Sequence, residues 1–231
     1  MAGDAALLLE FGDAIEEGTN DDVQGLRRQV AAAGLRGVLG AVPGYATLLL
    51  EYDPAIWEPE GLLAAVAGLA AREDSAPARR RHVIPVCYGG EFGPDLEGVA
   101  RSLGLREDAV IRQHGGRDYH IYCVGFSPGF PYCGALPPSL QLPRRDAPRT
   151  RVPAGAVAIA GLQTGVYPRE TSGGWHLIGR TPLELFRWDR DDPVPYEPGD
   201  AVRFRAIGEA AFEELRERSR SGEDLLESSA F

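Results

Sequence analysis

Apolar residues in the first third of the chain recur with strand and helix periods, and they predict a small α+β unit. Val23, Leu26 and Val30 share one helix face, and Asn20 is a residue type that caps helix N-termini. The expected elements are a strand at 7–11, a helix from residue 20, strands at 38–42 and 47–52, a helix at 59–72 and a strand at 82–88. This order matches a ferredoxin-like unit, and it leaves open whether the last strand belongs to the next domain.

The remainder of the chain has a different pattern, in which short apolar segments alternate with turn-rich loops. Short helices are expected at 95–103 and 106–113, followed by strands at 119–124, 157–160, 176–178, 185–188 and 202–206. Short strands separated by turn residues are typical of a β-barrel or sandwich. Beyond residue 207 the sequence is acidic, and it predicts an amphipathic helix followed by a frayed tail.

A change of composition at 73–81, where proline and arginine gather, marks the expected linker between the two patterns. We therefore predict three parts. They are a ferredoxin-like α+β domain at 1–80, a β-barrel domain at 81–208 and an acidic helical tail at 209–231.

Composition narrows the classes of protein to which the chain could belong. Its 231 residues, 44% hydrophobic and 25% charged, are those of a globular protein, and the formal net charge of −10 opposes nonspecific nucleic-acid binding. No apolar run approaches a membrane span, and the N-terminus lacks the basic start of a signal peptide, so we expect a cytoplasmic protein without membrane contact. The three cysteines lack metal-ligand spacing, so no metal site is expected.

Lysine is absent from the sequence, and all 24 basic residues of the Lys and Arg class are arginines. This absence excludes a Schiff-base mechanism and a P-loop lysine. Any anionic ligand must therefore be bound by guanidinium groups, which stay charged near neutral pH.

Four segments between residues 119 and 182 are rich in glycine, proline, aromatic residues and arginine. Their sequences are G-F-S-P-G-F-P-Y at 125–132, P-R-R-D-A-P-R-T-R-V-P-A-G at 143–155, Q-T-G-V-Y-P at 163–168 and G-G-W-H-L-I-G-R-T-P at 173–182. Glycine lets backbone approach a ligand, proline stiffens the loop, and rings and guanidinium groups supply stacking faces and anion sites. We expect these segments to build a ligand pocket.

Seven residues of these segments carry the groups that we expect to bind substrate. They are Arg144, Arg149, Gln163, Thr164, Tyr167, Trp175 and Arg180. Two alternatives stay open at this point. The arginines between 144 and 151 suit either anion binding or plain solvation, and Trp175 suits either the pocket or the core.

Three further positions bear on catalysis. His114 is the candidate acid or base because imidazole titrates near neutral pH, with helix capping as the alternative. Glu91 and Asp95 flank a tight turn, and we expect Asp95 to cap the following helix. Ser127 matches the G-x-S-x-G pattern, but Pro128 has no N–H for an oxyanion hole, so we expect a shaped turn rather than a nucleophile.

Motifs in a fixed order run along nearly the whole chain. Besides the four segments and His114 they are L-L-L-E-F-G-D at 7–13, V-P-G-Y at 42–45, I-P-V-C-Y-G-G-E-F-G-P-D-L at 84–96 and E-P-G-D-A-V-R-F at 197–204. The chain resembles the family that contains the B subunit of 5-oxoprolinase, the allophanate hydrolase subunit 1 domain and an inhibitor of a sporulation sensor kinase. This resemblance implies an α+β fold in which a cyclophilin-like β-barrel follows the ferredoxin-like domain.

The resemblance also implies a function. It points to the B subunit of a bacterial ATP-dependent 5-oxoprolinase, which converts the small-molecule substrate 5-oxo-L-proline to L-glutamate together with A-like and C-like partner subunits. ATP is expected to act through the assembled complex, because no recognised ATP motif lies in the sequence, and the chain alone is expected to be inactive. Two alternatives are implied as well: the carboxyltransferase half of a biotin-dependent urea carboxylase or allophanate hydrolase system, and a histidine-kinase inhibitor.

Overall fold

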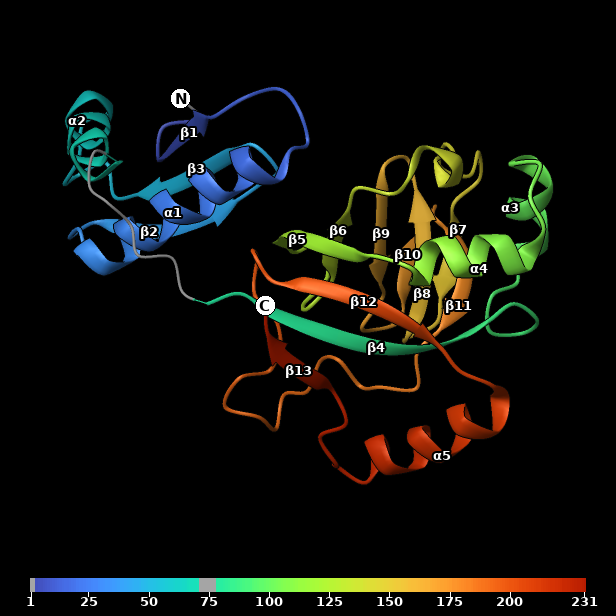
Figure 1. Ribbon diagram of the computed structural model, residues 1–231. Coiled ribbons are helices and arrows are strands. Elements are labelled where there is room, and N and C mark those ends of the chain that lie inside the picture. The colour runs from blue at the N-terminus through green and yellow to red at the C-terminus, as the bar shows by residue number, and fades with distance from the viewer. Residues whose placement is uncertain (1–2, 71–77) are drawn as a thin grey trace. The chain divides into compact units, whose positions relative to one another are not determined.

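The computed structural model describes residues 3–70 and 78–231, and the chain divides into two compact units, Met1–Ala78 and Arg79–Phe231 (Figure 1). Residues 73–77 of the expected linker lie outside the described residues. Among the described residues, no helix combines the length and the apolar character that crossing a membrane requires.

The first unit is a three-stranded antiparallel sheet with two helices. Its elements are β1 (Ala6–Glu10), α1 (Glu17–Ala33), β2 (Val38–Pro43), β3 (Thr47–Tyr52) and α2 (Pro59–Ala70), and the strand order is β1-β3-β2. The central strand alternates, so that Leu48, Leu50 and Tyr52 are buried. They form one apolar cluster with Val23 on α1 and Leu62 on α2, because both helices turn their apolar faces to the sheet.

The structure decides one question left open for this unit and corrects one expectation. The strand expected at 82–88, β4 (Arg80–Tyr88), belongs to the second unit and pairs there, so the ferredoxin-like arrangement is not confirmed. Asn20 does not cap α1, which begins three residues earlier at Glu17. Its buried side-chain amide instead donates hydrogen bonds to the carbonyl oxygens of Gly44 (3.0 Å) and Tyr45 (2.9 Å), and so it fixes the β2–β3 turn.

The second unit is built on a closed seven-stranded β-barrel, consistent with a cyclophilin-like barrel. With β4 its strands are β5 (Asp118–Val124), β6 (Pro131–Gly134), β8 (Ala156–Ala160), β9 (Gln163–Val166), β11 (His176–Arg180) and β12 (Ala201–Ala206). The order β11-β8-β9-β6-β5-β12-β4 closes where Gly179 pairs with Tyr88 and Arg180 with Cys87. The β4–β12 pair is parallel and the other pairs are antiparallel.

Alternation along β8 separates the two apolar clusters of this unit. Val157 and Ile159 lie in the main core, whereas the alanines at 156, 158 and 160 lie under a second, aromatic cluster on the other face.

The barrel closes tightly because glycines stand where two backbone segments approach each other closely. A Cβ on Gly93 would lie 2.0 Å from the carbonyl oxygen of Ile178, and one on Gly179 would lie 2.6 Å from Val86 Cγ1.

The remaining elements surround this barrel (Figure 1). They are α3 (Leu96–Ser102), α4 (Glu107–Gly115), a 3₁₀ turn (Pro138–Leu140), the paired strands β7 (Arg149–Val152) and β10 (Thr171–Gly173), α5 (Glu209–Arg220) and β13 (Glu227–Ala230). The strand expected at 185–188 is not formed, and this stretch is a loop between β11 and β12 in which Trp188 is 74% exposed.

The expected frayed tail is also corrected. Residues 227–230 form β13, which pairs antiparallel with the first half of β4. The physical reason is the length of β4, which spans nine residues. β11 pairs only with the last two residues of β4. The edge of the first half of β4 is therefore open, and β13 covers it.

Candidate functional site

The loop segments singled out in the sequence meet over the aromatic cluster on the outer face of β8. Phe130 is its centre, with ring centroids 4.8 Å from Tyr132, 4.9 Å from Tyr167 and 5.5 Å from Trp175. Trp175 is only 5% exposed, so it fills this cluster as core tryptophans do. The alanines of β8 beneath the rings leave the space that these large side chains need.

Two arginines meet one carboxylate beside these rings. Asp95 Oδ1 lies 3.1 Å from Nη1 of Arg145 and 2.7 Å from Nη2 of Arg149, while Oδ2 accepts the backbone N–H of Leu177 at 2.7 Å. Asp95 stands at the N-cap position of α3 but makes no capping hydrogen bond, which corrects the role expected for it. Sequence reasoning left anion binding and plain solvation open for the arginine loop, and it missed that Asp95 holds two of these arginines.

The arginine pair is left with unused hydrogen-bonding capacity. Arg145 Nε and Arg149 Nη1 are buried and have no hydrogen-bond partner among the described residues. Two guanidinium groups facing one carboxylate also leave a net positive charge. Buried donors are normally paired, so this arrangement is suited to an anion such as a carboxylate.

The arginines and the rings belong to one site. Burial raises the pKa of Tyr167 to about 12, and the nearby charges of Arg144 and Arg149 act in the opposite direction. The two groups are also joined through the backbone, since Arg145 N–H donates to the carbonyl of Gly174 at 2.9 Å. We call this set the arginine–aromatic cluster; its members are Asp95, Phe130, Tyr132, Arg144, Arg145, Arg149, Tyr167 and Trp175.

The expected acid or base, His114, lies elsewhere, in the main core. Its ring is fully buried and stacks on Phe204 with centroids 4.5 Å apart. Burial lowers its pKa from 6.5 to about 3, so the imidazole is neutral at neutral pH. It was expected to titrate near neutrality, and its surroundings prevent this.

The hydrogen bonds of His114 run in one direction. The Thr164 hydroxyl donates to the carbonyl of Ala158 (3.1 Å), so it accepts the Nε2–H of His114 at 2.8 Å. Nδ1 therefore accepts the Tyr88 hydroxyl at 2.7 Å. Both ring nitrogens are thus used within the protein, and Thr164 serves this buried chain rather than an open pocket.

The other two expected residues do not join the cluster. Gln163 pairs with Gly134 and Ala160 along β9. Arg180 Nε donates to the carbonyl of Ala154 at 2.9 Å, and burial together with Arg216 and Arg220 of α5 lowers its pKa. The structure therefore brings together Arg144, Arg149, Tyr167 and Trp175 of the expected set, but not Gln163, Thr164 or Arg180.

Ser127 lies in a turn between two strands, β5 and β6, and no helix follows it. The strained residue of this turn is Phe126, with φ of 64°, rather than the serine. A nucleophile elbow needs a strand, a sharp turn at the serine and then a helix, so the geometry agrees with a shaped turn.

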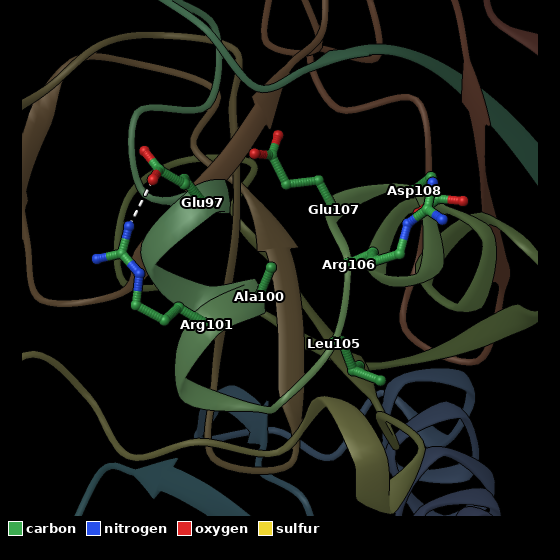
Figure 2. A pocket seen from close by; sticks show the side chains of 7 residues that line it. All are labelled: Glu97, Ala100, Arg101, Leu105, Arg106, Glu107 and Asp108. Carbon is green, nitrogen blue, oxygen red and sulfur yellow. Dashed lines mark hydrogen bonds and ion pairs between the residues drawn. The ribbon is translucent and has the colours of Figure 1, made fainter.

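A separate hollow of about 510 Å³ lies between α3 and α4 (Figure 2). Its lining pairs its own charges: Glu97 bonds Arg101, and Arg106 lies 3.1 Å from Asp108. None of the residues expected to bind substrate lines it. Its lining has three carboxylates and two guanidinium groups, and both guanidinium groups are already paired with carboxylates, so it is poorly suited to an anionic ligand.

Comparisons with known proteins agree with this architecture. The family model for the carboxyltransferase domain, subdomain C and D, matches residues 1–196. A protein of Bacillus subtilis (strain 168) named as the B subunit of 5-oxoprolinase is 39% identical over 94% of this chain and 95% of its own length. A protein of the same name from Escherichia coli O157:H7 is 41% identical, over 88% and 93% of the two chains.

Solved structures give the same relationship. The protein TTHA0988 is 40% identical with a TM-score of 0.79 over 87% of this chain, which spans only 40% of that longer protein. A conserved uncharacterized protein of Pyrococcus horikoshii is 41% identical over 91% of this chain and 98% of its own, with a TM-score of 0.56. The urea amidolyase of K. lactis shares the fold, with a TM-score of 0.81 at 18% identity over 100% of this chain and 16% of that one.

Proposed function

We propose a function that starts from family membership, since the chain belongs to the carboxyltransferase domain, subdomain C and D, family. In this proposal it is the B subunit of an ATP-dependent 5-oxoprolinase, which converts 5-oxo-L-proline to L-glutamate. Support comes from two relatives that are named as 5-oxoprolinase B subunits, which are 39% and 41% identical and match this chain over nearly their full length.

Within this function, the arginine–aromatic cluster binds the carboxylate of the substrate. The observation that carries this assignment is the pair of buried, unpartnered donors, Arg145 Nε and Arg149 Nη1, beside a single carboxylate. A substrate carboxylate would accept these donors and balance the surplus charge. Tyr167 and Trp175 form a rigid apolar wall beside it, and Arg144 adds a further positive charge.

The catalytic groups and ATP are divided among different polypeptides in this proposal. The chain has no lysine for a phosphate-binding loop, and the neutral, enclosed His114 is a positioning residue rather than an acid or base. ATP and the remaining catalytic groups therefore come with the A-like and C-like partner subunits.

The experiment that tests this proposal compares two arginines of the same strand, β7. Arg149 contacts Asp95 and its side chain is 24% exposed, whereas the side chain of Arg151 is 77% exposed and pairs with Glu170. In a complex reconstituted with both partner types, Arg149→Gln should raise the KM for 5-oxoproline about 10- to 100-fold, the worth of a charged hydrogen bond. Arg151→Gln is the matched control and should leave it unchanged.

Two outcomes distinguish a failure of the proposed function from a failure of the site assignment. If the wild-type complex releases no glutamate from 5-oxoproline and ATP, the proposed function is wrong. If the complex is active and both variants have the same KM, the function stands and the assignment of the arginine–aromatic cluster is wrong.

The family description itself favours a second candidate, a carboxyltransferase half that works with biotin. The likeness to the urea amidolyase supports the fold of this candidate and nothing more. Carboxyl transfer from a carboxylated biotin carrier to urea by the reconstituted complex, without turnover of 5-oxoproline, would establish it in place of the oxoprolinase.

A further inference from the structure

A serine, a histidine and an aspartate are joined by hydrogen bonds where β13 meets β4. Ser228 and His82 are directly opposite each other in this antiparallel pair. The backbone N–H of Phe231 donates a hydrogen bond to the carbonyl of Arg79. Hydrogen-bonded and non-hydrogen-bonded pairs alternate along an antiparallel ladder, so Ser229 and Arg81, two residues along, are also a hydrogen-bonded pair. The Ser228–His82 pair is therefore of the non-bonded type, in which side chains approach most closely.

The hydrogen bonds of this group also have a fixed direction. Asp200 Oδ2 lies 2.9 Å from Nε2 of His82 and also accepts the backbone N–H of Glu197, while Oδ1 accepts the backbone N–H of Arg80. Burial alone would raise the pKa of Asp200, but these hydrogen bonds lower it overall, so the carboxylate is ionised and only accepts. Nε2 of His82 therefore carries a proton, and in the neutral imidazole Nδ1 has a lone pair that faces the Ser228 hydroxyl at 2.8 Å.

The three residues differ in their exposure to solvent. His82 is fully buried, and its ring meets the edge of Tyr196 at a centroid distance of 6.0 Å, whereas Ser228 is exposed. In a non-bonded pair the backbone N–H of Ser228 points away from β4, toward the side of β13 where the described residues place no further strand. Ser228 and its backbone donor thus stand at the surface, while the ring nitrogen 2.8 Å from its hydroxyl belongs to the buried His82.

We propose that Ser228, His82 and Asp200 form a nucleophilic site that takes acyl groups from carboxylic esters, with Ser228 as nucleophile, His82 as base and Asp200 as the group that orients it. The bond from Ser228 Oγ to the acyl carbon forms as the hydroxyl proton passes to His82 Nδ1. The bond from the acyl carbon to the alkoxide then breaks, and His82 returns the proton to the leaving alkoxide. Water hydrolyses the acyl-serine to a carboxylic acid and restores the hydroxyl.

The site is independent of the proposed oxoprolinase function. It uses none of the residues of the arginine–aromatic cluster, and it depends on a strand, β13, that sequence patterning did not predict. Ser127 offers a contrast within the same chain, because its hydroxyl has no hydrogen-bond partner among the described residues and hence no base.

Covalent labelling of the purified full chain with a fluorophosphonate tests the proposal. Such a probe forms a bond between Ser228 Oγ and phosphorus and releases fluoride, while the proton passes to His82. Peptide mapping by mass spectrometry should place the label on Ser228. Ser228→Ala should lower the rate of labelling at least about 10²-fold, and Asp200→Asn should lower it as well, because the base is no longer held in its tautomer.

Ser229→Ala is the matched control, since Ser229 is the next residue of the same strand, is also exposed and points to the opposite face. It should label like the wild type. Absence of label in the wild-type chain, label on any other residue, or equal rates for Ser228→Ala and Ser229→Ala would each overturn the proposal. In those cases the three residues only fasten β13 to β4.

Discussion

Single side chains in this protein owe their chemistry to burial more than to their intrinsic properties. His114 is neutral because it is enclosed by Phe204 and by the hydroxyls of Tyr88 and Thr164, and both ring nitrogens are already bonded. Asp95, an ordinary capping residue by sequence, instead holds two arginines. The same physical cause applies to both, since a buried polar group must find its partner within the fold.

The depressed pKa of His114 predicts a pH dependence of stability. In the unfolded chain the imidazole binds a proton below about pH 6.5, but in the folded chain only below about pH 3. Between these values the unfolded state holds more protons, so the free energy of unfolding should fall by up to about 1.4 kcal/mol per unit as pH is lowered.

Urea unfolding of the wild type and of His114→Gln at several pH values between 4 and 7 checks this. The variant cannot titrate at this position, so its free energy of unfolding should depend on pH with a slope smaller by about one proton. Equal slopes for the two proteins would show that His114 is protonated in the folded state.

Among the elements, β4 has the most neighbours. It pairs with β12 along one edge, and β13 and β11 divide the other edge between them. Its alternate residues Ile84 and Val86 lie in the main core. β4 therefore contributes to the closure of the barrel, to the main core and to the pairing of the last strand, β13. All of these contacts lie within the second unit, which explains why β4 pairs there rather than with the sheet of the first unit.

Removal of β13 tests how much this strand contributes to stability at the edge of β4. A chain ending at residue 222 should be less stable by about 1–3 kcal/mol, because ladder hydrogen bonds and the Ser228 partner of His82 are lost. The uncovered edge of β4 should also promote association. Urea unfolding and light scattering measure both effects, with a chain ending at Ala230 as the control that keeps β13. Equal stability of the two chains would mean that β13 contributes nothing to this edge.

At the scale of the whole molecule, the chain is two units with separate apolar cores, one under the three-stranded sheet and one in the barrel. In the proposed function its arginine–aromatic cluster binds the carboxylate of the substrate. The relatives are named as B subunits of 5-oxoprolinase, and this name indicates the character of one component of a larger enzyme.

This character predicts that the purified chain alone will not convert 5-oxoproline. Glutamate release should stay at background with ATP present, and it should rise only when the A-like and C-like partner subunits are added. Sustained turnover by the isolated chain would contradict the division of catalytic groups among the three polypeptides.

Periodicity along the sequence was sufficient for those elements whose burial depends on local pattern. The apolar segments at 38–42 and 47–52 predicted the pair β2 and β3, and the helical spacing of Val23, Leu26 and Val30 predicted α1. The order of the motifs indicated the family, and the glycine- and arginine-rich segments pointed to four residues that do converge, Arg144, Arg149, Tyr167 and Trp175.

Only the tertiary structure decided which groups become partners. Periodicity shows which face of an element is apolar, but it carries no information on what covers that face, because strand pairing and buried hydrogen bonds join residues far apart in the chain. The sequence alone therefore determined the family and most of the elements. The pairing of β4 with β12 and β13, the turn held by Asn20, the two arginines on Asp95 and the enclosure of His114 were decided by contacts between residues at least 24 positions apart.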